Sequence, residues 1–221
     1  MSSPAHDART QVAAAARRLA EAGLLIGTAG NVSMRVDDLI AITATGTVLA
    51  DITPDQITIV DPHGTVVSGA FAPTSELHLH LGIYHDFDAG AIVHTHAPKS
   101  TAVGLVLSEL PVLHYQQLPL GGPTPVVPFH PFGTPELADA VRAALPGRFA
   151  ALLANHGAVT HAPTLDQAVE YALLLEWACT LYVDAATIGT PRALTAEEQT
   201  AVADVIRRTG YGTPKVIEER T

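Results

Sequence analysis

Cysteine is almost absent from this chain of 221 residues, which holds one, Cys179. A single cysteine cannot form an internal disulfide, and this favours a reducing compartment. Long apolar runs are missing as well: no window holds the ~18 uninterrupted apolar residues typical of a membrane-spanning helix. The first residues, MSSPAHDART, lack the basic stretch and apolar run of a secretory signal. We therefore expect a cytoplasmic protein with no membrane partner.

Basic residues are also few. Lysine and arginine number 12 against 22 acidic residues, which gives a formal net charge of −10. Nucleic acids and anionic membrane surfaces are bound through basic faces, so we expect neither as a general partner. Apolar residues, by contrast, make up 48% of the chain and charged residues 15%. This is enough apolar material to fill a core, which excludes wholesale disorder.

Strands and helices are expected to alternate along the whole chain. Periodicity and capping residues predict helices over 7–22, 74–84, 134–145, 164–184 and 196–208. The stretch 27–33 leads into a short strand, and further strands are predicted over 39–43, 56–60, 65–68, 91–95, 125–128 and 150–154. Hairpins near the start argue against a purely parallel sheet. With no linker to divide it, the chain is predicted to form a single α/β domain over 1–221, a mixed and mostly antiparallel sheet with helical layers.

Histidine is over-represented, with 11 residues, and its sharpest pattern is His94-Thr95-His96. Residues i and i+2 of a strand point to the same face, so two imidazoles project together from the end of one predicted strand. His156, before Gly157 at the end of another predicted strand, is the third candidate. Three histidines with an open fourth position are typical of catalytic zinc. The alternative is that the pair is ordinary polar surface.

Glu76 is the natural fourth member of such a site. It lies in Pro73-Thr74-Ser75-Glu76 at a predicted helix start, where a carboxylate also interacts favourably with the helix dipole. That structural explanation remains open. The other histidines are weaker candidates, because i+2 spacing on a helix does not bring side chains together and the rest fall in predicted loops: His78, His80 and His85 on the helix, His6, His63 and His161 in loops.

Three turns are rich in glycine and short hydroxyl side chains. They are Gly27-Thr28-Ala29-Gly30-Asn31-Val32-Ser33, Thr43-Ala44-Thr45-Gly46 and Pro73-Thr74-Ser75. Each places backbone N–H groups and small donors at the boundary of an element, which suits an anion. The pattern is not a P-loop, because the lysine of that motif is missing. Taken alone, each such sequence is usually just a structural turn.

Taken in order, these segments resemble the class II zinc-dependent sugar-phosphate aldolases, the family of L-fuculose-phosphate aldolase and L-ribulose-5-phosphate 4-epimerase. The resemblance covers nearly the whole chain and rests on the first glycine-rich turn, Thr45-Gly46, Thr74-Ser75-Glu76, His94-Thr95-His96 and Asn155-His156-Gly157. It implies a central antiparallel sheet with helical layers and a four-fold symmetric homotetramer. The apolar side chains of the helix over 164–184 cover more than one stripe, which agrees with such assembly or with a helix held between two layers of one subunit.

The resemblance also implies a role for each matching residue. His94, His96 and His156 would ligate Zn²⁺, and Glu76 would be the catalytic acid/base that also ligates zinc when no substrate is bound. The phosphate-binding positions would be Thr28 (or Gly27), Asn31, Thr45, Gly46, Thr74 and Ser75. Tyr115 and Tyr211 match two tyrosines that reach the site from a neighbouring subunit. One departure is Asn155, where some members carry histidine.

The reaction so implied is reversible cleavage of a ketose 1-phosphate, similar to L-fuculose 1-phosphate, into dihydroxyacetone phosphate and an aldehyde. Epimerase members place an acidic residue beside the tyrosine after the HxH pair, whereas this chain has His114-Tyr115 and no Asp or Glu between Glu109 and Glu136. A methylthioribulose-phosphate dehydratase and a decarboxylase of the same family remain alternatives. The adducin head, a non-catalytic module of this fold, is expected to lack the zinc histidines that are present here.

Overall fold

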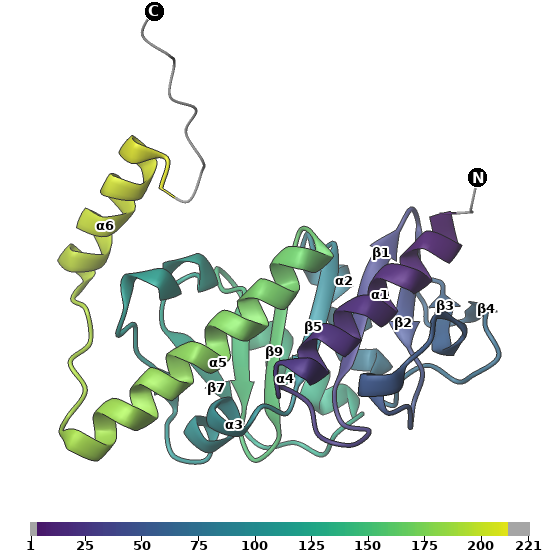
Figure 1. Ribbon diagram of the computed structural model, residues 1–221, viewed down its shortest axis with the longest axis horizontal. Coiled ribbons are helices and arrows are strands. Elements are labelled where there is room, and N and C mark those ends of the chain that lie inside the picture. The colour runs from purple at the N-terminus through teal and green to yellow at the C-terminus, as the bar shows by residue number, and fades with distance from the viewer. Residues whose placement is uncertain (1–3, 212–221) are drawn as a thin grey trace, which may run out of the picture.

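A nine-stranded sheet runs along the molecule (Figure 1), in the order β4-β3-β2-β1-β5-β9-β8-β7-β6. The structure is a computed structural model that describes residues 4–211. Neighbouring strands pair antiparallel, except that β7 and β8 are parallel. The predicted mixed, mostly antiparallel sheet is confirmed. The strands are β1 Asn31–Val36, β2 Leu39–Thr43, β3 Ile57–Val60, β4 Val66–Ser68, β5 Ala91–Thr95, β6 Glu109–Leu110, β7 Thr124–Val127, β8 Ala150–Leu153 and β9 Gly157–Ala162.

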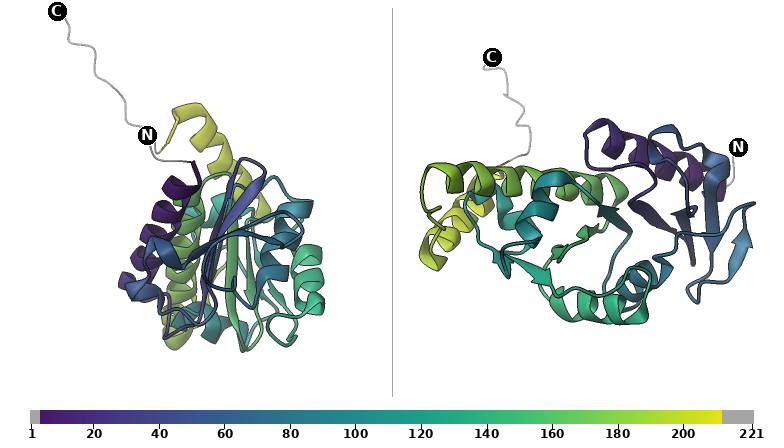
Figure 2. Two further views of the ribbon diagram at one scale, coloured as in Figure 1. Left: turned by 90° about the vertical axis from the view of Figure 1, so that its right-hand side faces the viewer. Right: turned by 90° about the horizontal axis from the view of Figure 1, so that it is seen from below.

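Helices lie on both faces of this sheet. They are α1 Pro4–Glu21, α2 Leu77–Asp86, α3 Pro98–Gly104, α4 Pro135–Ala144, α5 Leu165–Ile188 and α6 Ala196–Thr209. Figure 2 shows α1 and α5 on one side of the sheet and α2 and α4 on the other. The predicted α/β architecture with helical layers is therefore confirmed.

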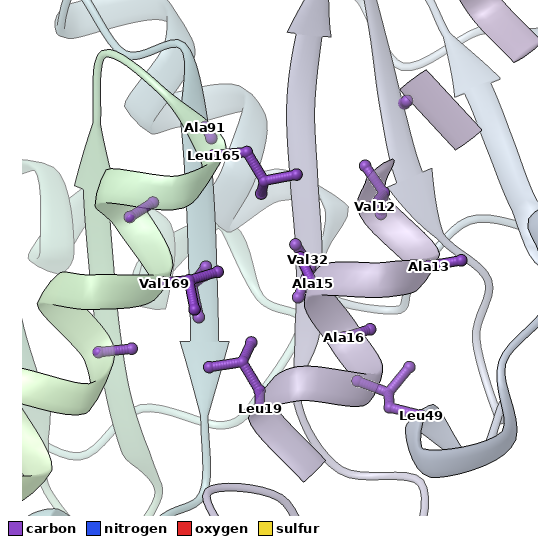
Figure 3. Packing of buried hydrophobic residues seen from close by; sticks show 14 of the residues in the cluster. Val12, Ala13, Ala15, Ala16, Leu19, Val32, Leu49, Ala91, Leu165 and Val169 are labelled. Atoms are coloured by element: carbon purple, nitrogen blue, oxygen red, sulfur yellow. The ribbon is translucent and has the colours of Figure 1, made fainter. Parts of the chain in front are cut away.

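Alternating side chains of the central strands supply a core to each layer. In β5, Ala91 and Val93 pack in the cluster formed with α1 and α5, whereas Ile92 between them packs in the cluster of α2 and α4. Figure 3 shows Leu19 of α1 and Val169 of α5 in the first of these cores. Both faces of β5 are thus buried, which makes this strand a rigid support for any side chain at its end.

The strand pairing brings three distant segments to one end of the sheet. Because β1 and β5 are antiparallel, Asn31 at the start of β1 lies opposite His94 near the end of β5. On the other side of β5, Thr95 lies opposite Ala158 of β9. His156 lies in the turn between β8 and β9 and therefore reaches the same end. Topology alone brings the start of β1, the end of β5 and this turn together.

Two helices leave apolar surface uncovered. Among residues 4–211, α5 is the one helix that is long and apolar enough, by length and composition alone, to cross a membrane. Of its most apolar 18-residue stretch, 22% is buried. It packs on the sheet instead, through Leu165, Ala168, Val169, Ala172, Leu175, Ala178 and Cys179. Trp177 and Ile188 of the same helix are exposed. Helix α6 has no buried residue and stands away from the body of the molecule in Figure 1.

The structure differs from several local predictions, and strand β6 was not predicted either. The helix predicted from position 74 begins at Leu77, because Thr74 is held by a backbone hydrogen bond to Thr43 O at the end of β2. Helix α3 and strand β9 were missed. All residues of β9 are buried, so the alternation that marks a half-exposed strand is absent there. His6 and His161 were both expected in solvated loops, but His6 lies in α1 and His161 lies in β9, where it is 4% exposed.

Candidate metal and anion site

Three histidine rings face one another at this end of the sheet. The ring centroids of His94, His96 and His156 lie 4.8 to 4.9 Å apart. The Nε2 atoms of His94 and His96 are 2.9 Å apart. Glu76 joins them, since one ligand atom from each of the four residues lies within 4.8 Å of the others. The structure therefore brings together all four residues singled out as a metal site.

A backbone carbonyl orients the ring of His94. Its Nδ1 lies 2.9 Å from the carbonyl oxygen of Ala158 in β9, so the ring donates its Nδ1 hydrogen to that oxygen. In a neutral ring the lone pair is then on Nε2, which lies 2.9 Å from Oε2 of Glu76. Metal-ligating histidines are commonly oriented in this way, through a hydrogen bond of the far ring nitrogen.

The carboxylate of Glu76 turns away from the helix that follows it. Glu76 is the N-cap residue of α2, yet its side chain makes no capping hydrogen bond. Oε2 accepts a hydrogen bond from Nδ2 of Asn31 at 3.0 Å. Oε1 is buried without a hydrogen bond and lies 3.4 Å from Nε2 of His156. The contacts of Glu76 are with the histidine cluster rather than with the helix terminus.

Burial and charge set the protonation of this cluster. Burial, followed by the charges of His94 and His156, lowers the pKa of His96 to about 3. Burial and His94 lower the pKa of His156 to about 4. Burial disfavours ionisation of Glu76, but the charge and hydrogen bond of His94 outweigh it, so the pKa of Glu76 falls well below its usual range. Burial disfavours the charged form of His94, but the charge and hydrogen bond of Glu76 outweigh it and raise the pKa of His94. Near neutral pH, His96 and His156 are therefore neutral and Glu76 is a carboxylate, the states that metal ligation requires, whereas a bound cation would displace the Nε2 proton of His94.

These groups fit a divalent cation. Imidazole nitrogens and one carboxylate are the donor set that zinc prefers, in the number it usually takes. The buried Oε1 of Glu76 lacks a hydrogen bond, and such an atom needs a partner. A cation among the four side chains would supply it.

A cavity of about 380 Å³ opens beside the cluster. It is lined by metal-site residues and by the three polar turns identified in the sequence. All six predicted phosphate-binding residues line it: Thr28, Asn31, Thr45, Gly46, Thr74 and Ser75. Backbone hydrogen bonds hold two of the turns together, from Thr45 N to Ala72 O at 3.1 Å and from Thr74 N to Thr43 O at 3.0 Å. Short donors and backbone groups thus surround a space next to the histidines.

Glycine is required where the histidine turn approaches β5. A Cβ atom on Gly157 would lie 2.1 Å from the carbonyl oxygen of Thr95. Asn155, two residues earlier, has a φ of 57°, a conformation that Asn tolerates better than most residues. The Asn155-His156-Gly157 sequence therefore allows the turn to hold His156 against the end of β5.

The two predicted tyrosines lie elsewhere in this chain. The hydroxyls of Tyr115 and Tyr211 are 3.3 Å apart and exposed. They line a groove with apolar residues of α6 and do not line the cavity beside the histidines. Within one copy of the chain, residues 4–211 do not bring these tyrosines to the cluster.

Sequence reasoning missed several residues around the site. Phe132 lines the cavity although it carries no motif. His80 and Tyr84 are buried behind Glu76, and His80 is hydrogen-bonded to Asn31. The available signal was the spacing of Glu76, His80 and Tyr84 at four-residue intervals, which places them on one face of the helix.

Comparison with known proteins gives a consistent match. Residues 10–183 match the family model for the class II aldolase and adducin N-terminal domain. A 5-deoxy-D-ribulose 1-phosphate aldolase of Bacillus thuringiensis serovar kurstaki is 33% identical over 207 residues, covering 92% of this chain and 96% of the relative. An L-fuculose phosphate aldolase of Escherichia coli is 37% identical over 182 residues, covering 81% of this chain and 84% of the relative.

The fold agrees with these relatives. A solved structure of an L-fuculose 1-phosphate aldolase matches with a TM-score of 0.86 and 33% identity, over 91% of this chain and 96% of that one. The resemblance inferred from the ordered motifs is confirmed. The chain therefore belongs to the class II aldolase and adducin N-terminal domain family, and within it the chain is an aldolase, an aldehyde-lyase.

Proposed function

We propose that this enzyme catalyses the zinc-dependent, reversible cleavage of a ketose 1-phosphate to dihydroxyacetone phosphate and an aldehyde. The observation that supports it most strongly is the cluster of three histidines and Glu76 within 4.8 Å of one another, beside a cavity lined by anion-binding turns. A sugar phosphate has one group for each part of this site, oxygens for the metal and a phosphate for the turns.

His94, His96, His156 and Glu76 would hold the zinc ion. When bound, zinc would supply a Lewis acid for the negative charge that develops on the substrate oxygens as the C3–C4 bond breaks. The protein's part is to present neutral imidazoles on a buried strand end and a tight turn. Substrate oxygens would approach from the cavity, on whose wall His96, His156 and Glu76 lie.

Glu76 would move the proton at C3. In the cleavage direction the C4 hydroxyl loses its proton as C4 becomes the aldehyde carbon, and C3 keeps the bonding electrons of the C3–C4 bond. Glu76 must first take up a proton, which it then gives to C3 to complete dihydroxyacetone phosphate. In the synthesis direction the carboxylate removes that proton. A general acid/base must reach the reacting atom, and Glu76 lies on the wall of the cavity. Tyr115 and Tyr211 of a neighbouring subunit would exchange a proton with the hydroxyl at C4.

The phosphate would bind in the polar turns. Thr28, Thr45, Thr74 and Ser75 offer hydroxyls, and Gly46 offers a backbone N–H, while the amide of Asn31 keeps one hydrogen beyond the one it gives to Glu76. Dipoles of this kind can hold a dianion without a lysine. The negative net charge of the chain does not prevent this, because local groups decide the field in a pocket.

The substrates named for the relatives suggest where to begin. We propose a ketose 1-phosphate of the 5-deoxyribulose or fuculose type, because the aldolases of these two sugars cover most of this chain. The epimerase alternative is disfavoured, because no acidic residue lies beside Tyr115 in the sequence. We further infer a homotetramer and a cytoplasmic location, the latter because the single cysteine, Cys179, is buried and unpaired.

A substrate panel tests the proposal. Zinc-loaded protein is offered 5-deoxyribulose 1-phosphate, fuculose 1-phosphate, ribulose 5-phosphate and an unphosphorylated ketose, and release of dihydroxyacetone phosphate is followed with and without chelator. We expect cleavage of at least one ketose 1-phosphate, loss on chelation, return with zinc and little turnover of the free sugar. Equal turnover of free and phosphorylated sugar, or epimerisation without cleavage products, would reject it.

A further inference from the structure

A buried line of polar side chains runs through the contact between β1 and α2. Asn31 and Ser33 are two residues apart on β1 and share a face, while Glu76, His80 and Tyr84 are four apart and share a face of α2. All five are buried, none more than 7% exposed. Around them this contact is apolar, with Leu79, Ile83 and Ile92 in the same core. Burying so many polar groups in an apolar layer is costly unless each is hydrogen-bonded.

Each member of the line is hydrogen-bonded to the next. From the site outward, Nδ2 of Asn31 is 3.0 Å from Oε2 of Glu76 and Oδ1 of Asn31 is 2.5 Å from Nε2 of His80. Nδ1 of His80 is 2.7 Å from Oγ of Ser33, which is 2.9 Å from the hydroxyl of Tyr84. At the far end, Arg35 donates to the carbonyl oxygen of Tyr84 at 3.0 Å and lies over its ring.

The carboxylate fixes the direction of every one of these bonds. An ionised carboxylate only accepts, so Asn31 turns its NH₂ group to Glu76 and its oxygen to His80. Nε2 of His80 must then carry the hydrogen. Because a neutral imidazole has one N–H, Nδ1 accepts from Ser33, and Ser33 in turn accepts from Tyr84. All donors therefore point toward Glu76, an arrangement in which successive bonds polarise one another.

We propose that His80 is a positioning residue of the reaction: its Nε2–H tautomer holds the amide of Asn31 so that Asn31 fixes Oε2 of Glu76 and leaves Oε1 as the oxygen that exchanges the proton. This rests on the acid/base role proposed for Glu76. Oε1 is the carboxylate oxygen without a hydrogen bond; it would ligate the cation when no substrate is bound and leave it to exchange the proton when substrate binds. His80 itself does not line the cavity, so it acts through Asn31.

Asn31 needs this support because an amide is nearly symmetric in shape. Its oxygen and NH₂ ends have similar size, and a flipped amide would present its oxygen to the carboxylate, where two acceptors repel. A donor at Oδ1 removes the flipped state. Catalytic groups held by such supporting contacts keep the geometry that the reaction needs, and a displacement of about 1 Å can cost about 10²-fold in rate.

The first test is spectroscopic and does not depend on activity. Protein labelled with ¹⁵N in histidine, without metal, is examined by long-range ¹H–¹⁵N correlation of the imidazoles, and the His80 ring is assigned by its loss in His80→Gln. We expect a neutral ring with hydrogen on Nε2 and none on Nδ1. A ring with hydrogen on Nδ1, or a charged ring near neutral pH, would overturn the proposal.

The second test is kinetic and uses matched variants of two buried histidines. His80→Phe keeps a ring of similar shape but cannot donate to Asn31, and we expect kcat to fall between about 10-fold and 10²-fold with a much smaller change in KM. His80→Gln can donate from its amide and should recover most of kcat. His161→Phe removes the other ring, in β9, and should leave kcat unchanged. If His80→Phe does not fold, Ser33→Ala takes its place and should lower kcat less.

The outcomes separate the two proposals. An inactive wild-type protein with the expected His80 spectrum would reject the proposed function while supporting the arrangement of Asn31 and Glu76. An active wild-type protein whose His80→Phe variant, or Ser33→Ala in its stead, keeps full kcat would reject the positioning role alone. A His80→Gln variant as slow as His80→Phe would also reject it, because the donated hydrogen would then not be what matters.

Discussion

Burial gives the histidines of this chain different tasks. His94 directs its Nε2 into the site because its Nδ1 donates to Ala158 O. His80 is fully enclosed, and burial lowers its pKa to about 3, so it serves as a neutral donor and acceptor. His161 packs against Phe149, with the two ring centroids 5.4 Å apart. Residue type alone distinguishes none of these roles, since each follows from what surrounds the ring.

At this scale Glu76 provides the clearest prediction. Glu76→Gln preserves shape but cannot carry a proton between substrate atoms. We expect zinc to remain bound, more weakly, and kcat to fall by roughly 10² to 10⁴, the usual share of a general acid/base. Zinc content by elemental analysis and cleavage rate are measured on one preparation. An unchanged kcat would reduce Glu76 to a structural carboxylate.

His161 predicts how stability responds to acid. Burial lowers the pKa of His161 below its ordinary value of 6.5, so below about pH 6.5 the unfolded chain binds a proton that the folded chain does not. The free energy of unfolding therefore decreases as pH falls, by at most about 1.4 kcal/mol per pH unit for this group. Urea unfolding of metal-free protein at about pH 7 and about pH 5 should show a smaller loss in His161→Phe than in wild type. Equal losses would show that His161 does not contribute.

At the scale of elements, the turn from β8 into β9 couples backbone geometry to the site. Gly157 has no room for a side chain against the Thr95 carbonyl, and His156 is its neighbour. The start of α2 likewise fixes the position of a site residue, because Glu76 is the N-cap residue that precedes Leu77. His156 and Glu76 thus each lie just before an element, β9 and α2 respectively, that packs in the core of the molecule.

Substituting this glycine tests that coupling. In Gly157→Ala the added carbon must displace the backbone of β5 or of the turn. We expect a loss of roughly 1–3 kcal/mol or more in unfolding free energy together with weaker zinc binding. The matched control is Gly189→Ala at the end of α5, where a Cβ would meet nothing within 4 Å. A Gly157→Ala variant that binds zinc as wild type does would contradict the coupling.

Local patterns predicted the elements whose signals are local. The strands expected over 39–43 and 91–95 coincide with β2 and β5, because each is a short apolar run with turn residues at its ends. The neighbours of β5 could not be predicted, since the place of β9 between β5 and β8 is a long-range pairing. The four-residue spacing that brings His80 behind Glu76 was visible, but its partners on β1 were not. The sequence therefore indicated the candidate ligands and missed the side chains that orient them.

At the scale of the whole molecule, the exposed apolar surface and the position of the two tyrosines are consistent with the proposed homotetramer. Val202, Val205 and Ile206 of α6 line a groove with Tyr115 and Tyr211, and α6 has no buried residue. Large exposed apolar patches are rare on monomers, and closed assemblies bury them. If a second chain packed against this groove, Tyr115 and Tyr211 of the first chain could reach the histidine cluster of the second. Within residues 4–211 of one chain, no tyrosine hydroxyl of this pair lies at that cluster.

Mixing two inactive variants tests this arrangement. If Tyr115 acts across a subunit contact, Glu76→Gln and Tyr115→Phe damage sites from opposite sides. We expect part of the activity to return after the two are dissociated and reassembled together, because some mixed sites are then intact on both sides. Each variant reassembled alone is the control. An active monomer by light scattering, or no recovery where labelled subunits are proven to exchange, would refute the shared site.

The metal centre is tested most directly by measuring zinc content and cleavage of ketose 1-phosphate in the same samples of wild type and His156→Ala. His156 lies in the turn between β8 and β9, so replacing it changes no residue of the sheet. We predict about one zinc per wild-type chain with release of dihydroxyacetone phosphate, and loss of both in His156→Ala with its circular dichroism unchanged. A folded His156→Ala variant with full zinc occupancy and wild-type cleavage would contradict the assignment.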